Sequence, residues 1–360
     1  MEDLSEIEKL RKIIDEVDVS LLNLMNKRAD VAKQIGLLKK NQKEPAVVYR
    51  PDREARVIRQ LLKNNKGPLS EPSVEVIFKD IISSCRSLEA KLRIAYLGPE
   101  GSYTEAAMVK HFGKFIEKDS CNDISSVFKE IEICNSDYGI VPIENSYGGS
   151  VTESLDSLIS NTVYIIGEVY LVIKHNLLST EANLKDIETV FAHQQSLSQC
   201  RVWLKSNLPD ANLISVSSNS AAVQKSLLEK NSASIASLQA SEIYKIPSLE
   251  PNIADSSNNT TRFIILGKKI GKTSGQDRTS IAFGVKNQFG ALYDVLTCFY
   301  NAGISLSKIE SRPSGQDLWE YIFYVDLVGH CDDEPLSIAL KEVSKKVSML
   351  KILGSYPQAF

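Results

Sequence analysis

The chain has 360 residues, of which 43% are hydrophobic and 24% charged, a composition typical of a globular protein with two or three domains. Its net charge of -3 provides neither the basic excess that nucleic-acid binding requires nor an acidic tail. The N-terminus lacks the apolar core of a signal peptide, and no apolar run approaches the roughly 18 residues that span a bilayer. We therefore expect a cytoplasmic protein that binds neither nucleic acid nor a membrane.

The spacing of cysteines and histidines gives no indication of a metal site. The six cysteines form no CxxC pair, and the four histidines are scattered along the chain. The glycine patterns typical of nucleotide binding are also missing. We expect chemistry carried out by side chains and backbone alone, with no cofactor and no metal.

The first segment, residues 1–92, is predicted to be helical. Apolar residues recur at helical spacing from Leu4 to Leu38, and no proline interrupts them before Pro45. A helix over residues 6–40 would be about 50 Å long, too long to bury its apolar face within so small a domain. An intertwined dimer is therefore expected. Further helices are predicted after Pro51 and over about residues 73–91.

Cations occur at apolar positions of this helical segment. The four of interest are Arg11, Arg28, Lys39 and Arg53. Arg28 and Lys39 share one helix face, because eleven residues correspond to about 20° of net rotation. Glu54 and Glu89 do not balance four cations, so a small dicarboxylate ligand would complete the charge. Arginines that extend along the surface into water are the alternative.

The stretches Glu8–Arg11, Lys27–Arg28 and Val48–Glu54, together with Lys39, resemble the all-helical chorismate mutase family over residues 4–90. The resemblance implies that Arg11 and Arg28, from different chains of a dimer, clamp the two carboxylates of chorismate. It also implies that Lys39 and Glu89 face the ether oxygen, that Glu54 takes the hydroxyl, and that Arg53 and Cys85 line the site. Preorganised donors at that oxygen suit a Claisen rearrangement, which needs no nucleophile. Some relatives carry glutamine and serine at positions 89 and 85, and a glutamate donates only when protonated.

From residue 92 onwards, short apolar strands alternate with amphipathic helices, which predicts an α/β fold. Three polar clusters, Gly98–Thr104, Val141–Ser146 and Asn258–Arg262, adjoin predicted strands. Ser102 with Glu105, and likewise residues 150 and 153, have the spacing of a helix-capping box. Each cluster alone is consistent with a plain turn, whereas three together favour a ligand cleft.

The chain resembles prephenate dehydratase over residues 93–268, in the stretches Tyr96–Thr104, Val141–Ser146, Ala192–Cys200, Asn219–Ala222 and Asn259–Phe263. The resemblance implies two α/β lobes around a cleft, as in periplasmic binding proteins, and conversion of prephenate to phenylpyruvate. Thr261 is the main catalytic candidate, as a donor to the departing ring hydroxyl, and Glu144 is the carboxyl alternative. The implied substrate-binding residues are Ser102, Thr104, Asn145, Ser146, Gln199, Arg262 and Phe263. The chain departs from many relatives at Ala192 and Gln194, where serine and proline are common.

The last segment, residues 278–360, follows the order strand, helix, strand, strand, helix, strand, which predicts an α+β ferredoxin-like sandwich. Residues 268–278 are polar and are expected to form a linker. The stretches 290–293 and 310–313 resemble the phenylalanine-binding ACT domain of dehydratases, although Phe289 replaces a family proline. The resemblance implies that phenylalanine binds as an allosteric inhibitor, between ACT domains, at Gly290, Ala291, Leu292, Glu310, Ser311, Arg312 and Pro313.

The sequence therefore predicts a multidomain chain: a helical mutase domain at residues 1–92, a dehydratase domain at 93–272 and an ACT domain at 278–360. The predicted activity is the two-step conversion of chorismate to phenylpyruvate, in a homodimer or larger homo-oligomer that phenylalanine inhibits. Two alternatives stay open. One is a dehydratase whose helical domain only dimerises or binds regulators. The other is an amino-acid sensor without catalysis. A preference for arogenate over prephenate is also open.

Overall fold

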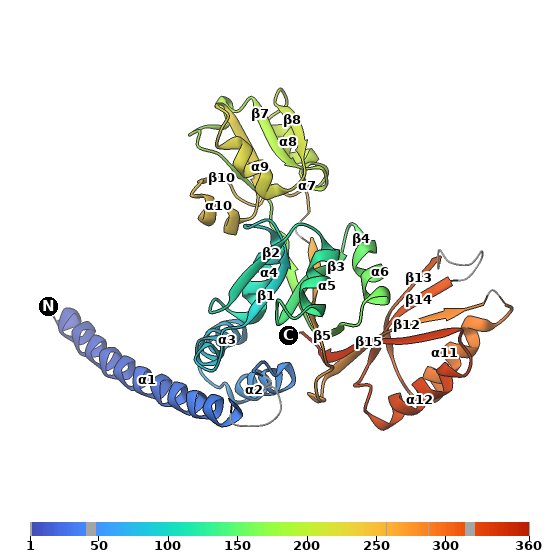
Figure 1. The fold of residues 1–360 in the computed structure, drawn as a ribbon. Coiled ribbons are helices and arrows are strands. Elements are labelled where there is room, and N and C mark those ends of the chain that lie inside the picture. Colours follow the sequence, from blue (N-terminus) through green and yellow to red (C-terminus); the bar gives the residue numbers. More distant parts are fainter. Residues whose placement is uncertain (1, 41–47, 257, 287, 314–320, 360) are drawn as a thin grey trace. The chain divides into compact units, whose positions relative to one another are not determined.

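The computed structural model describes residues 2–40, 48–256, 258–286, 288–313 and 321–359. The chain divides into two compact units (Figure 1). One contains residues 1–50, 57–92 and 112–117, and the other contains residues 51–56, 93–111 and 118–360. Within the described ranges, no helix combines the length and the apolar character that crossing a membrane requires.

The first unit is helical, as the apolar spacing predicts. Its main helices are α1 (Glu2–Lys40) and α3 (Glu71–Ser87), and α2 (Pro51–Asn64) begins at the expected proline. The C-terminal part of α1 buries Ala32 and Gly36. Earlier in α1, apolar side chains that are 44–57% exposed form a continuous face, which we call the α1 stripe: Ile7, Leu10, Ile14, Val17, Leu21 and Met25.

The second unit begins with an α/β lobe, here called lobe 1. Its sheet has the order β5-β11-β3-β1-β2, with β4 paired to β3. The strands are β1 (Arg93–Leu97), β2 (Glu117–Cys121), β3 (Tyr138–Asn145), β4 (Gly149–Ser150), β5 (Tyr164–Val172) and β11 (Thr260–Gly267). The helices are α4 (Tyr103–Phe112), α5 (Ile124–Glu132) and α6 (Thr152–Ser160).

A second α/β lobe, lobe 2, is inserted between β5 and β11. Its sheet has the order β10-β6-β9-β7-β8 and its own apolar core. The strands are β6 (Asn176–Leu178), β7 (Thr189–His193), β8 (Asn212–Val216), β9 (Ser232–Ala236) and β10 (Ser248–Glu250). The helices are η1 (Leu184–Asp186), α7 (Gln194–Gln199), α8 (Arg201–Asn207), α9 (Asn219–Ser226) and α10 (Leu238–Tyr244). The two predicted lobes are thus confirmed.

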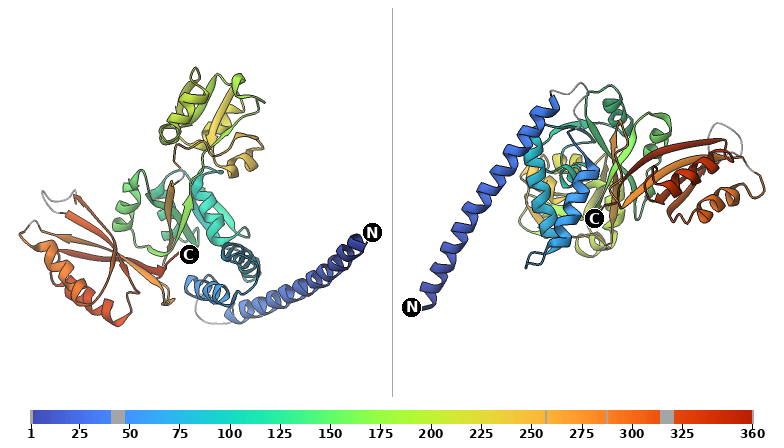
Figure 2. Two further views of the ribbon diagram at one scale, coloured as in Figure 1. Left: turned by 180° about the vertical axis from the view of Figure 1, so that it is seen from behind. Right: turned by 90° about the horizontal axis from the view of Figure 1, so that it is seen from below.

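The last segment has the predicted ferredoxin-like order. Its strands β12 (Asp277–Val285), β13 (Leu306–Pro313), β14 (Tyr321–Val328) and β15 (Met349–Pro357) form an antiparallel sheet in the order β13-β14-β12-β15. The helices α11 (Ala291–Asn301) and α12 (Glu334–Ser344) lie together on one face of these strands (Figure 2). The sequence predicts that β14 starts at Trp319, which lies outside the described residues.

The last segment is joined to lobe 1 more closely than the predicted linker suggests. β15 pairs with β5, so one sheet runs through both parts. The core of lobe 1 also includes Leu353 and Tyr356 of β15. Residues 268–278 end in an ordered turn, in which the buried Asp277 carboxylate accepts the backbone N–H groups of Ser274 and Gly275 at 2.8 and 3.1 Å. The predicted linker therefore ends in a turn that hydrogen bonds stabilise.

The structure also corrects the predicted cap at Ser150. This residue lies in β4, and α6 begins two residues later after Val151, without a side-chain cap. Ser150 Oγ instead donates to the Glu310 carboxylate of β13. The capping spacing was misleading because the hydroxyl has a stronger, charged acceptor from a distant strand.

Candidate active sites

Two predicted motifs meet because β11 runs antiparallel to β3. The register pairs Thr261 with Asn145 and Arg262 with Glu144. The Asn145 carboxamide oxygen accepts the backbone N–H groups of Tyr147 and Gly148 at 3.0 and 2.9 Å, so its nitrogen faces Thr261. That nitrogen donates to Thr261 Oγ1 at 2.8 Å. Thr261 is therefore an acceptor in this bond, and its own proton is left for another partner.

The same carboxamide begins a chain of hydrogen bonds towards lobe 2. Asn145 Nδ2 also donates to Asn259 Oδ1 at 2.8 Å, and Asn259 Nδ2 donates to Gln199 Oε1 at 2.9 Å. His175 Nε2 lies 2.7 Å from the same Gln199 oxygen. Sequence reasoning named Asn145, Gln199 and Thr261 but missed Asn259 and His175. Asn259 stood in the string that resembles the dehydratase, whereas His175 carried no motif signal.

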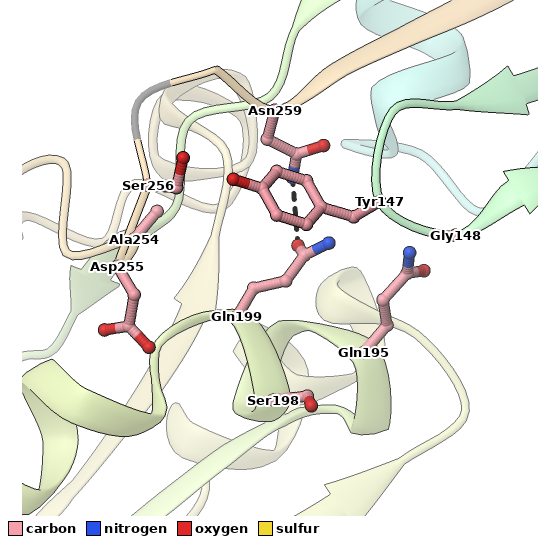
Figure 3. A pocket seen from close by; sticks show the side chains of 9 residues that line it. All are labelled: Tyr147, Gly148, Gln195, Ser198, Gln199, Ala254, Asp255, Ser256 and Asn259. Atoms are coloured by element: carbon pink, nitrogen blue, oxygen red, sulfur yellow. Dashed lines mark hydrogen bonds between the residues drawn. The ribbon is translucent and has the colours of Figure 1, made fainter.

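A pocket of about 370 Å³ opens beside this series of hydrogen bonds (Figure 3). It is lined by Tyr147, Gly148, Gln195, Ser198, Gln199, Ala254, Asp255, Ser256 and Asn259. Figure 3 shows the Gln199 oxygen turned to Asn259 and its nitrogen turned away from it. Thr261 is 8% exposed and adjoins the pocket through Asn145 and Asn259 rather than forming its wall.

Several predicted substrate-binding residues make bonds within the protein. Ser102 Oγ donates to the Leu97 carbonyl at 3.1 Å and accepts the backbone N–H of Glu105 at 3.3 Å. Ser146 Oγ donates to the Asn258 carbonyl at 3.2 Å and accepts from Thr260 N at 3.0 Å. Thr104 and Phe263 are buried. For these four residues, contact with a substrate stays a prediction.

Arg262 lies in a buried charge cluster with groups of lobe 1 and the last segment. Its Nε is 2.8 Å from Glu168, and its Nη1 is 2.6 Å from Asp326. The Tyr356 hydroxyl accepts from Nη2 at 2.9 Å, and burial raises the pKa of that phenol. Arg278 lies 2.5 Å from the same Glu168 carboxylate oxygen. These contacts place the Arg262 guanidinium at the junction between lobe 1 and the last segment. Its role in substrate binding stays a prediction.

Glu144 is linked to the predicted effector strand. Lys308 of β13 lies 3.0 Å from the Glu144 carboxylate and 3.3 Å from that of Glu310. Arg312 pairs with Asp156 of α6 at 3.1 Å. Two of the predicted effector-binding residues, Glu310 and Arg312, thus also contact lobe 1.

The other predicted effector-binding residues lie along two elements of the last segment. Gly290 adopts a left-handed backbone conformation, with φ at 79°, immediately before α11. Ala291 and Leu292, in the first turn of α11, pack against the apolar core of the last segment. Ser311 and Pro313 lie on β13. Binding of phenylalanine by these residues stays a prediction.

In the helical unit, Lys39 and Glu89 form an ion pair of 2.9 Å. Gly36 makes room for this arrangement, because a Cβ atom there would lie 3.1 Å from the Cγ of Glu89. Cys85 is buried on α3. Arg11 and Arg28 are exposed along α1, whereas Arg53 and Glu54 lie in the first turn of α2.

Three family models match the chain in sequence order. They describe chorismate mutase type II at residues 10–90, prephenate dehydratase at 94–270 and the ACT domain at 279–344. A relative from Aquifex aeolicus, named bifunctional chorismate mutase/prephenate dehydratase, is 41% identical over 99% of both chains. The chain belongs to the bifunctional chorismate mutase/prephenate dehydratase family. Family members of the same name from Pseudomonas aeruginosa and Escherichia coli are 40% and 32% identical, over 100% and 97% of this chain and 100% and 95% of theirs.

Solved structures resemble the dehydratase and ACT domains. A prephenate dehydratase from Arthrobacter aurescens, in complex with L-Phe, is 29% identical with a TM-score of 0.69, and covers 74% of this chain and 90% of its own. GqqA, described as a novel type of quorum-quenching acylase, is 25% identical with a TM-score of 0.68, over 74% of this chain and 98% of its own. Because this fold is shared by proteins with different described activities, the domain series and the site residues carry the assignment of function.

Proposed function

We propose that this chain rearranges chorismate to prephenate in its helical domain and converts prephenate to phenylpyruvate in its dehydratase domain, under inhibition by phenylalanine. The observation that carries the dehydratase assignment is the bond from Asn145 to Thr261, which leaves the threonine proton available close to the pocket. The alternatives of a sensor without catalysis, or a helical domain that only dimerises, are weakened because the full-length relatives carry both enzyme names.

In the mutase step, the protein must hold chorismate in a reactive conformation and stabilise charge on the breaking ether oxygen. Lys39 and Glu89, already 2.9 Å apart, are the proposed pair at that oxygen. Arg11 and Arg28 are the proposed carboxylate clamp, with Glu54 at the hydroxyl and Arg53 and Cys85 as further lining. A protonated Glu89 would donate to the ether oxygen, whereas an ionised one would repel its developing charge.

The mutase site is proposed to be completed by a second copy of the chain. The α1 stripe leaves six apolar side chains 44–57% exposed, which is costly in water. Their spacing of three and four residues is that of a helix face that packs against another helix. A homodimer in which α1 helices pair would cover this face and bring Arg11 of one chain to the site of the other.

In the dehydratase step, prephenate loses its ring carboxylate as carbon dioxide and its ring hydroxyl as water. Aromatisation supplies the driving force, so the site has chiefly to assist departure of the hydroxyl. Thr261 is proposed to donate its hydroxyl proton to that oxygen, because the Thr261 oxygen already accepts a hydrogen bond from Asn145. Glu144, whose carboxylate is 3.0 Å from Lys308, is the alternative source of the proton.

Phenylalanine is proposed to bind the ACT domain at residues 290–292 and 310–313. A solved prephenate dehydratase that covers 74% of this chain was determined in complex with L-Phe. Glu310 shares Lys308 with Glu144, at 3.3 and 3.0 Å, which supports a direct route from effector strand to dehydratase site. Inhibition requires that phenylalanine bind the less active state more tightly.

The test is to supply chorismate to the purified chain and identify the products, with and without phenylalanine. We expect prephenate to appear first and phenylpyruvate to follow, with the second step slowed by phenylalanine. Accumulation of prephenate alone would remove the dehydratase assignment. Conversion of supplied prephenate but not of chorismate would leave a dehydratase with a helical dimerisation domain. Arogenate supplied in parallel tests substrate preference.

A further inference from the structure

The hydrogen-bond chain at the dehydratase site has one internally consistent direction. It starts from the backbone, because the N–H groups of Tyr147 and Gly148 fix Asn145 Oδ1 as an acceptor. Asn145 Nδ2 must then donate to Asn259 Oδ1, so Asn259 presents its nitrogen to Gln199. The Gln199 oxygen is thereby an acceptor, and its nitrogen is left without a role in this chain.

The last link assigns a proton to His175. A carboxamide oxygen faces His175 Nε2 at 2.7 Å, so this ring nitrogen must carry the hydrogen. Burial lowers the pKa of His175, which is 2% exposed, and favours the neutral ring. In that form Nδ1 is an acceptor, and the Tyr103 hydroxyl lies 3.0 Å from it and 2.9 Å from the Lys174 carbonyl. The single proton of this hydroxyl thus has two acceptors within reach, so the assignment of the His175 hydrogen to Nε2 rests on the Gln199 oxygen.

We propose that His175 is a positioning residue of the dehydratase site, which holds the Gln199 carboxamide so that its NH2 group faces the pocket. The inference rests on the proposed role of this pocket as the prephenate site. Prephenate carries carboxylates and a hydroxyl, all of which accept hydrogen bonds. Turning the Gln199 amide over would present an oxygen to these groups and would leave His175 Nε2 and Asn259 Nδ2 facing a donor.

Two substitutions separate a positioning role from a packing role. His175→Gln places an amide nitrogen near the position of Nε2, whereas His175→Met has a similar length but no donor. We expect His175→Met to raise KM for prephenate by about ten- to hundredfold. The buried Gln199 oxygen then loses the N–H of His175, and the Gln199 NH2 group is no longer held facing the pocket. Turnover should change less, because Asn145 still orients Thr261. His175→Gln should restore most of the lost affinity.

The controls use the whole chain. Chorismate mutase activity and the thermal unfolding of each variant report on folding, and His175→Met in a Gln199→Met background should add no further increase in KM. Nitrogen-15 labelling of the four histidines should show His175 as the Nε2–H tautomer at neutral pH, independently of activity. Equal KM values for the Gln and Met variants, or an Nδ1–H tautomer, would overturn the inference. A wild-type protein that does not act on prephenate would instead overturn the proposed function.

Discussion

Replacing Glu168 by glutamine would unbalance the buried charges at the junction of lobe 1 and the ACT domain. The Glu168 side chain is 1% exposed and lies 2.8 Å from Arg262 and 2.5 Å from Arg278. Asp326 is the second anion, 2.6 Å from Arg262. These two cations and two anions sum to zero, so the glutamine variant keeps one uncompensated positive charge in the interior.

The expected loss of stability is large for an isosteric change. Removing one partner of a buried pair costs about 3–5 kcal/mol, because the other charge stays desolvated. Glutamine still accepts one N–H from the arginines, so we expect about 3 kcal/mol. For a cooperative unit of this size, each kcal/mol lowers Tm by about 2–4 °C, which gives a decrease of about 10 °C.

Thermal unfolding followed by circular dichroism measures this decrease. The matched control is Glu342→Gln, which removes an exposed carboxylate paired with Lys345 at 2.6 Å and should leave Tm unchanged. A Glu168→Gln protein that unfolds at the same temperature as the control would refute the view that this cluster is charge-balanced and dry. Adding Asp326→Asn to Glu168→Gln should lower Tm further, because Arg262 then loses Asp326 as well and keeps only the more distant Glu144 carboxylate at 4.0 Å.

Four further predictions concern function and pH. Gly36→Ala should favour helix formation by about 1 kcal/mol yet lower mutase turnover about tenfold by displacing Glu89, with dehydratase activity as the control; unchanged mutase turnover would contradict this. Thr261→Ala should lower dehydratase turnover by about 100-fold or more and spare the mutase, while Thr261→Ser should keep most of it. Glu310→Ala should weaken inhibition by phenylalanine without abolishing dehydratase turnover, and full inhibition in this variant would place the effector elsewhere. Burial lowers the pKa of His175 in the folded chain, so on acidification the unfolded chain binds this proton first. The free energy of unfolding should therefore decrease as the pH drops below about 6.5, and it should decrease less steeply in His175→Gln.

The elements of this fold follow closely from local sequence patterns. The uninterrupted apolar spacing before Pro45 predicts α1, and the order of elements in residues 278–360 predicts the ferredoxin-like sandwich, because both depend on periodicity within one segment. Asn145 and Thr261 were both expected to line one cleft, since both lie in strings that resemble one family. These parts needed no information about contacts between distant residues.

What the sequence could not supply depends on register and on long-range partners. The bonds of Asn259 and His175 arise from strands that are distant in sequence, and no local spacing encodes them. Ser150 has the right spacing for a cap, but Glu310, 160 residues away, takes its hydroxyl. Arg262 was expected to line the cleft because its motif does, whereas its guanidinium is engaged by Glu168 and Asp326.

The pairing of β15 with β5 has a consequence for how the protein unfolds. At the contact, Gly354 packs so tightly that a Cβ atom would lie 2.0 Å from the Ile165 carbonyl oxygen. Tyr356 is part of the lobe 1 core, so the ACT strand cannot leave without opening that core. Backbone amides of β5 and β15 should therefore exchange with solvent in a single cooperative event. A ligand that binds only the folded ACT domain would then slow exchange in the dehydratase lobe as well, whether or not it alters catalysis.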